Sequence, residues 1–160
     1  MDERLDVMSV VATFALAADT LRWNDLRAIL APEVVLDYTS LWGGEARRTP
    51  REDIIAGWRE LLPGFTHTAH LIGAVRVVLT EGSAYSEAPV MASHAIQDES
   101  LAGNNRWAVG GRYEMQMERH NGQWQISALT LADAWTEGNP GLPEAARQRV
   151  REGRGRQSEG

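Results

Sequence analysis

The stretch "HLIGAVRVVL", residues 70–79, marks the point at which the sequence changes from helical to extended in character. It is rich in β-branched residues and poor in helix formers, which favours a strand. Helical patterns dominate before Gly64, and this stretch is the first of four strand-like segments. Helices followed by a run of strands predict an α+β fold, with the helices on one face of an antiparallel sheet.

Three helices are expected before this point, over residues 3–20, 24–31 and 49–64, with a short strand over 33–40. In the last helix, Thr49 and Glu52 have the spacing of a capping box. The apolar positions of the first helix, three or four residues apart, are Leu5, Met8, Val11 and Ala15.

Turn residues predict how the strands follow one another. Asn121-Gly122 separates the last two strand-like segments and is a strong signal for a tight hairpin. Pro89 falls inside the second segment, where it indicates a bulge or a sheet edge because proline has no backbone N–H.

Composition bounds the protein's class. The chain has 160 residues, the size of one domain, and 43% of them are hydrophobic, enough for a sizeable core. It has no cysteine, which excludes disulfides and thiolate chemistry, and no lysine, which excludes a Schiff base on a side-chain amine. No apolar run approaches the ~20 residues of a membrane span, and no signal peptide is visible. We expect a soluble cytoplasmic protein with no membrane partner.

The charge is unevenly distributed. The net charge is −6, but residues 144–160 hold five arginines and three glutamates, which leaves −8 on residues 1–143. We therefore expect one domain over 1–143 and a flexible basic tail over 144–160. A basic arm for RNA is the other interpretation of the tail. The acidic body argues against a nucleic-acid partner.

Two histidines in strand-like segments, His70 and His94, are candidates for chemistry. His67 and His70 lie three positions apart, so a strand directs them to opposite faces, and we do not expect a two-histidine metal site. His70 shares its face with apolar residues and is either a core histidine or a site residue. His94 has small residues on its face, which suits a pocket lining or a tight contact between helix and sheet.

Asp19 and Tyr38 are further candidates. Asp19 lies near the end of the first helix, where the helix dipole disfavours an acid. It either caps the next helix or is a partly buried carboxylate that orients a histidine. Asp37 and Tyr38 alternate on a short strand, and if Tyr38 points inward it places a phenol in the interior.

Six tryptophans are many for this length. They either pack the core or, for Trp42 and Trp107 near loops, cover a flat aromatic substrate. Val75, Val77 and Leu79 alternate along a strand, and their placement on the outer face of the sheet predicts a homodimer or homotrimer.

Together these residues resemble a known family. The order of "W-x-D-L-R", "DY-x-S", "HLIG", a later lone histidine and "NGQW-x-I" is similar to scytalone dehydratase, and more broadly to SnoaL-like members of the nuclear transport factor 2 superfamily. The resemblance runs from about residue 8 to about residue 139. It implies a cone-shaped α+β barrel in which a curved sheet wraps the N-terminal helices around one cavity, with chemistry that needs no metal or organic cofactor.

The resemblance also implies roles. His70 matches the catalytic histidine, Asp19 the carboxylate that pairs with it, and Tyr38 a tyrosine that polarises a substrate carbonyl through water. His94 matches a second cavity histidine that assists departure of a hydroxyl. The same Asp–His pair occurs in the related hexachlorocyclohexane dehydrochlorinase.

This chain departs from the dehydratase pattern at two positions. A second tyrosine of the family is Ala18 here, and Tyr113 stands where an asparagine contacts substrate. These departures place scytalone itself in doubt as the substrate but leave the base in place.

Elimination of water beside a carbonyl needs a base, a donor to the enolate and a proton for the leaving hydroxyl. An imidazole suits the base because its ordinary pKa of about 6.5 leaves it largely neutral at pH 7. The resemblance thus implies a lyase or isomerase acting on a polyketide-derived or other cyclic hydroxy-ketone of secondary metabolism. A cofactor-free cyclase or epoxide hydrolase, the latter with an Asp–Arg–Asp set for which Arg76 and Arg112 are candidates, remains an alternative, and so does a non-catalytic ligand-binding module.

Overall fold

The computed structural model describes residues 2–101, 103 and 105–158. The helices in this part of the chain are α1 (Glu3–Thr20), α2 (Trp23–Ile29), α3 (Thr39–Trp42), α4 (Arg51–Arg59), the 3₁₀ helix η1 (Leu62–Gly64) and α5 (Leu142–Arg151). The strands are β1 (Leu30–Asp37), β2 (Arg47–Pro50), β3 (His67–Ile72), β4 (Arg76–Thr80), β5 (Ser83–Ala95), β6 (Arg106–His120) and β7 (Gln123–Gly138).

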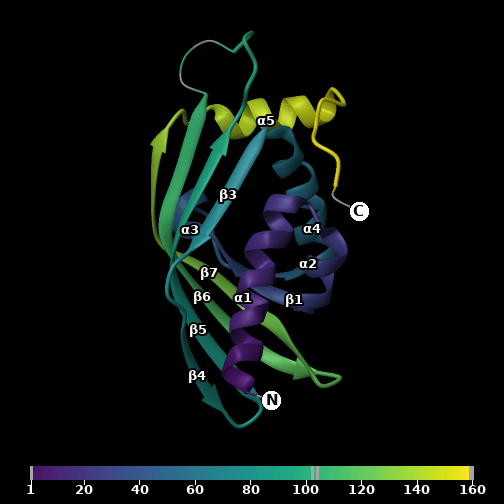
Figure 1. Cartoon of the computed structure of the whole chain (residues 1–160), viewed down its shortest axis with the longest axis vertical. Coiled ribbons are helices and arrows are strands. Elements are labelled where there is room, and N and C mark those ends of the chain that lie inside the picture. The colour runs from purple at the N-terminus through teal and green to yellow at the C-terminus, as the bar shows by residue number, and fades with distance from the viewer. Residues whose placement is uncertain (1, 102, 104, 159–160) are drawn as a thin grey trace.

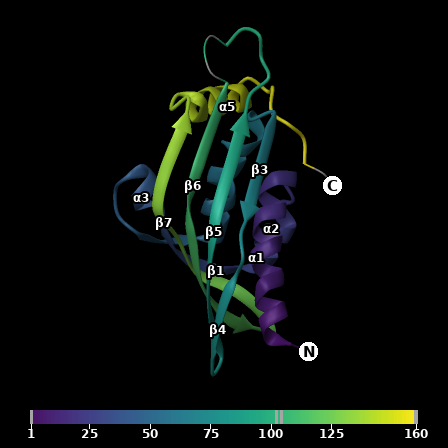
Figure 2. The same cartoon turned by 60° about the vertical axis from the view of Figure 1, so that its left-hand side comes forward.

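The strands form one curved, unclosed sheet. Its order is β2-β1-β7-β6-β5-β3, and β4 pairs with β5 beyond the end of β3. All pairs are antiparallel except β1 with β7, so the sheet is mixed. The sheet curves around α1, α2 and α4, and α5 lies across one end of its long strands (Figures 1 and 2). The predicted α+β cone with its helices on one face is confirmed.

Helix α1 has the predicted bounds, and half of its predicted apolar face is buried. Val11 and Ala15 are buried as predicted, but Leu5 is 62% exposed and Met8 39%. Val7, Val10 and Phe14 are buried beside Val11 and Ala15. The residues that face the sheet have the same spacing of three and four as the predicted set. Because the helix is apolar on more than one side, periodicity identifies the helix without selecting the side that packs.

The structure confirms the predictions made from Asn121-Gly122 and Pro89. Asn121 (φ 51°) and Gly122 (φ 80°) both have positive φ and join β6 to β7, with His120 opposite Gln123. This geometry is that of the type I′ turn that Asn-Gly favours. Pro89 lies where β5 passes from β3 to β4, and its carbonyl accepts a hydrogen bond from the Gly73 N–H at 2.8 Å. The missing N–H of the proline therefore faces a gap in the neighbouring strands, which is an edge position as predicted.

The predicted capping box is wrong. Thr49 belongs to β2, pairs with Val34 of β1, and donates its hydroxyl to the carbonyl of Arg47 at 3.2 Å. Helix α4 then begins at Arg51 without a side-chain cap. Pairing with β1 uses the backbone of residues 47–50 and outweighs the local capping pattern.

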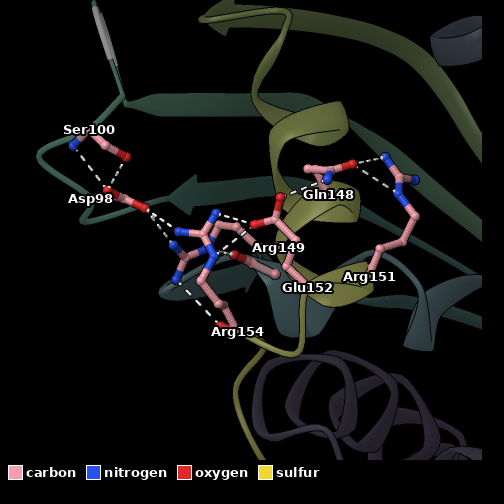
Figure 3. A network of polar contacts seen from close by, with 8 residues as sticks. Asp98, Ser100, Gln148, Arg149, Arg151, Glu152 and Arg154 are labelled. Carbon is pink, nitrogen blue, oxygen red and sulfur yellow. Dashed lines mark hydrogen bonds and ion pairs between the residues drawn. The ribbon is translucent and has the colours of Figure 1, made fainter.

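The C-terminal segment packs on the barrel. Residues 144–151 of the predicted tail fall in α5. Ala146 of this helix is buried and lies so close to Gly64 of η1 that a Cβ on Gly64 would come within 1.9 Å of the Ala146 carbonyl oxygen. Arg149 of α5 and Arg154 beyond the helix both bind Asp98 in the loop between β5 and β6, at 2.8 and 2.9 Å (Figure 3). Residues 159–160 lie outside the described part of the chain. The mobility of the segment stays a prediction.

The outer face of the sheet differs from expectation. Val75, Val77 and Leu79 pack against the hydrophobic core and not outward, so that basis for an oligomer is wrong. Exposed apolar side chains lie instead at Leu71, Met91 and Trp135, which the strand registers align in one row. A homodimer or homotrimer stays a prediction. Within the described residues, no helix has the length and apolarity that crossing a membrane requires.

Candidate active site

One cavity of about 400 Å³ opens between the helices and the concave face of the sheet. Its walls are largely aromatic and aliphatic, and two imidazoles and two phenols line it as well. The aromatic lining residues are Phe14, Tyr38, Trp42, Trp58, Trp107 and Tyr113. A largely apolar cavity with a few polar groups that converge on it is the usual form of a small-molecule site.

Asp19 and His70 form a tight pair at the edge of this cavity. The carboxylate Oδ1 lies 2.7 Å from Nδ1 of the imidazole, and Oδ2 accepts the backbone N–H of the same histidine at 2.8 Å. One carboxylate thus fixes both the ring and the backbone of His70. An ionised carboxylate only accepts hydrogen bonds, so Nδ1 carries the proton, and Nε2 holds a lone pair.

The environment keeps Asp19 ionised. Burial by itself would raise the pKa of Asp19, but the hydrogen bond and charge of His70, its backbone N–H and the hydroxyl of Thr68 together lower it. The His70 side chain is 10% exposed and that of Asp19 20%. His70 lines the cavity, and we find no protein partner for its Nε2 in the part of the chain that the structure describes. This nitrogen is a base without a competing hydrogen bond.

His94 lies beside the pair. Its ring centroid is 5.6 Å from that of His70, and its Nδ1 donates to the carbonyl of Trp107 at 3.2 Å. The rings of Phe65 and Trp107 both lie 4.8 Å away. This burial, helped by the nearby charge of His70, lowers the pKa of His94 to about 4. The imidazole is therefore neutral at pH 7, which argues against His94 assisting departure of a hydroxyl as a protonated acid.

Tyr38 and Tyr113 share a hydrogen bond on the cavity wall. Burial raises the pKa of Tyr113 to about 12 and that of Tyr38 well above its ordinary value. Each phenol carries one proton, which it can donate to the other phenol or to a ligand in the cavity. Both phenols stay protonated at neutral pH and can act as donors.

The two predicted tryptophans also line the cavity. Trp107 is buried and Trp42 is 56% exposed, with ring centroids 5.7 Å apart. Of the seven predicted site residues, six line the cavity, and the seventh, Asp19, holds His70 from behind.

Two acids and two arginines line the cavity, namely Glu45, Asp53, Arg47 and Arg147, but no ion pair joins them within the described residues into the acid–arginine–acid set that epoxide opening requires. Arg112 does join two acids, Glu114 at 2.7 Å and Asp133 at 2.8 Å, but none of the three lines the cavity. Arg76 pairs with Glu87 alone among the described residues. That part of the chain also holds no cluster of three or more His, Cys, Asp or Glu side chains suited to a metal ion.

Comparison with known proteins identifies the family of the chain. Residues 1–130 match the model of the SnoaL-like domain. The chain belongs to the SnoaL-like family. A protein named as a dehydratase from Pestalotiopsis microspora is 25% identical to this SnoaL-like chain over 153 residues, which cover 86% of this chain and 91% of the relative.

Solved structures share the fold. A protein from Kribbella flavida superposes on this SnoaL-like protein with a TM-score of 0.80 and 25% identity, over 90% of this chain and 96% of the other. A candidate scytalone dehydratase from Novosphingobium aromaticivorans gives a TM-score of 0.69 and 17% identity, over 86% and 87%. The family and the relative named as a dehydratase support a small-molecule-converting enzyme.

Several site residues of this SnoaL-like protein escaped the sequence analysis. Thr68 lies two positions before His70 on the same strand face, a spacing that alternation alone makes visible. Phe14 of α1 and Trp58 of α4 pack edge to face, with ring centroids 5.4 Å apart, and both line the cavity. Arg156 contacts the site from 137 residues away in sequence, which no local pattern indicates.

Proposed function

We propose that the protein is a cofactor-independent lyase or isomerase that removes a proton next to a carbonyl, with His70 as the base and Asp19 as its partner. The observation that carries this proposal is the 2.7 Å contact between Asp19 Oδ1 and His70 Nδ1, with Nε2 left on the cavity side. A paired, oriented imidazole beside an open apolar cavity is equipped for proton abstraction. A purely binding module has no need of such a pair.

The first step is transfer of the α-proton of a ketone to Nε2 of His70. The imidazolium that forms is stabilised by the Asp19 carboxylate, which stays ionised. The electron pair of the broken C–H bond moves into the carbonyl and forms an enolate. Its oxygen needs a donor, and Tyr113, which lines the cavity beside Tyr38, supplies one. Tyr113 of β6 thereby takes the place of the family tyrosine that is missing at Ala18 of α1.

The second step, in a dehydratase, is loss of the β-hydroxyl. The enolate re-forms its carbonyl, the C–O bond breaks, and the leaving oxygen takes the proton from the His70 imidazolium as water. His94 is neutral, and its Nε2 accepts the hydroxyl proton of the substrate in a hydrogen bond that orients the leaving group. In an isomerase, the proton returns to carbon instead.

The walls favour a flat cyclic substrate. Trp42, Trp107 and Trp58 present aromatic surfaces, and about 400 Å³ accommodates a molecule of two fused rings. We therefore propose a polyketide-derived or other cyclic hydroxy-ketone. Of the alternatives, epoxide opening loses support because the Arg112 set lies outside the cavity.

A direct test uses 3-hydroxy-1-tetralone, a bicyclic β-hydroxy-ketone that yields 1-naphthol on loss of one water. We expect the wild-type protein to accelerate 1-naphthol formation and His70→Ala to lower the rate at least about 100-fold. His67→Ala is the matched control, because His67 lies on the same strand and is exposed on its other face. Equal rates in the two variants would remove His70 from the mechanism.

A further inference from the structure

Arg156 reaches the back of the Asp19–His70 pair from the C-terminal strap, residues 152–156. Its guanidinium donates to the carbonyl of Asp19 at 2.9 Å and to that of Phe65 at 2.8 Å. The Nη2 atom also lies 3.2 Å from the Leu62 carbonyl and 3.2 Å from the hydroxyl of Thr68. One side chain thus joins the end of α1, the turn after η1 and strand β3, the three segments that place the pair.

These contacts explain how an acid, Asp19, is tolerated near the C-terminus of α1. An acid near the C-terminus of a helix meets the negative end of the dipole, and the last turn of α1 contains no basic residue. Arg156 supplies the cation from elsewhere in the chain and satisfies a carbonyl that the helix end leaves without an intrahelical partner. The planar fork of arginine suits several carbonyls at once, which the single ammonium of lysine does not.

The Thr68 hydroxyl transmits this contact to the carboxylate. A guanidinium can only donate, so Thr68 Oγ1 accepts from Arg156 and directs its own proton elsewhere. That proton is left to turn toward Asp19, and the Thr68 hydroxyl helps to lower the pKa of this carboxyl. Arg156, Thr68, Asp19 and His70 therefore form one chain of donors and acceptors with a single consistent direction.

Ion pairs and backbone contacts hold the strap in place and thereby fix the position of Arg156. Arg149 and Arg154 hold Asp98, and Arg154 also binds Glu152 (Figure 3). The backbone N–H of Arg156 donates to the Pro63 carbonyl at 2.7 Å. A Cβ on Gly155 would lie 3.1 Å from the Pro63 ring, so the strap runs close against η1.

We propose that Arg156 is a positioning residue for the Asp19–His70 pair, and that the C-terminal strap is part of the active-site support. Arg156 does not line the cavity and acts through Thr68 and the end of α1. Its effect on turnover rests on the proposed function, whereas its effect on the geometry of His70 does not.

The test is the tautomer of His70, observed by nitrogen NMR on histidine-labelled protein. In the wild type we expect one form, with the proton on Nδ1. In Arg156→Gln we expect a mixture of the Nδ1–H and Nε2–H forms, and about a 10- to 100-fold lower kcat on 3-hydroxy-1-tetralone with little change in KM. Arg151→Gln is the matched control, since it removes the same charge from exposed contacts to Glu144 and Gln148.

Thr68→Val provides a second variant that keeps the shape of the side chain and the three carbonyl contacts of Arg156. If Arg156→Gln does not fold, Thr68→Val tests the positioning role by itself. The proposal predicts that loss of the Thr68 hydroxyl produces the same mixture of His70 tautomers. A single Nδ1–H form and wild-type kcat in either folded variant would overturn the proposal. A changed tautomer together with no turnover of hydroxy-ketones by the wild type would overturn the proposed function and leave the positioning role supported.

Discussion

Acid should weaken the protein through His94, by an amount that the structure fixes. Burial among Phe65 and Trp107 lowers the pKa of His94 from 6.5 to about 4 in the folded state. The unfolded chain therefore binds a proton at higher pH than the folded chain does. The contribution of His94 to stability is complete above the unfolded pKa and is lost as the pH falls from about 6.5 to about 4.

The magnitude follows from the pKa difference. One pKa unit corresponds to about 1.4 kcal/mol, so the free energy of unfolding should fall by about 3 kcal/mol over this range because of His94 alone. His94→Gln removes the titration, while its amide can still donate to the Trp107 carbonyl. Other titrating groups, Asp19 among them, are common to both proteins and cancel in the comparison.

The assay is urea unfolding followed by tryptophan fluorescence, between about pH 7.5 and pH 4. We expect the wild type to lose about 3 kcal/mol more than His94→Gln over this interval. Parallel pH dependences in the two proteins would refute the assignment of His94 as a buried neutral imidazole. They would also reopen its role as a protonated acid.

Three further predictions concern the pair, the enolate donor and the C-terminal helix. Asp19→Asn should lower turnover of 3-hydroxy-1-tetralone at least about 100-fold in a protein that stays folded by circular dichroism, because an amide does not stabilise the imidazolium; wild-type turnover would contradict the mechanism. Tyr113→Phe should lower kcat about 10- to 100-fold, measured on the same ketone, with Trp58→Phe as a wall control; equal rates in the two would argue against a donor role. Gly64→Ala should lower the thermal midpoint while Gly57→Ala, which meets open space, should not, because a Cβ at Gly64 would clash with the Ala146 carbonyl; equal midpoints would contradict the close packing of α5 on η1.

The sequence was informative wherever one local signal dominated. The Asn121-Gly122 turn, the bounds of α1 and the strand character of residues 67–72 could all be predicted because dihedral preference and side-chain alternation are local properties. The same signals failed where tertiary contacts decide. Thr49 prefers a cap in isolation but pairs with β1 in the folded chain.

The site residues also divide into those that the sequence indicated and those that only tertiary contacts reveal. The resemblance supplied Asp19 and His70 as a pair, and their contact confirms that the two side chains meet. The protonation state of His94 could not be predicted from the sequence, because its low pKa depends on the rings of Phe65 and Trp107, which come from two other segments. Arg156 was hidden for the same reason, since a charged tail in sequence does not reveal which carbonyls it will meet.

The central claim, that His70 takes a proton from carbon, is tested most directly by hydrogen–deuterium exchange on 1-tetralone in heavy water. This ketone has exchangeable α-protons and no leaving group, so only the base and the enolate donor are assayed. The account predicts that the wild-type protein accelerates loss of the α-proton signal in proton NMR, and that His70→Ala abolishes the acceleration while His67→Ala retains it. Exchange that is undiminished in His70→Ala, or absent from the wild type although 1-tetralone binds in the cavity, would contradict it.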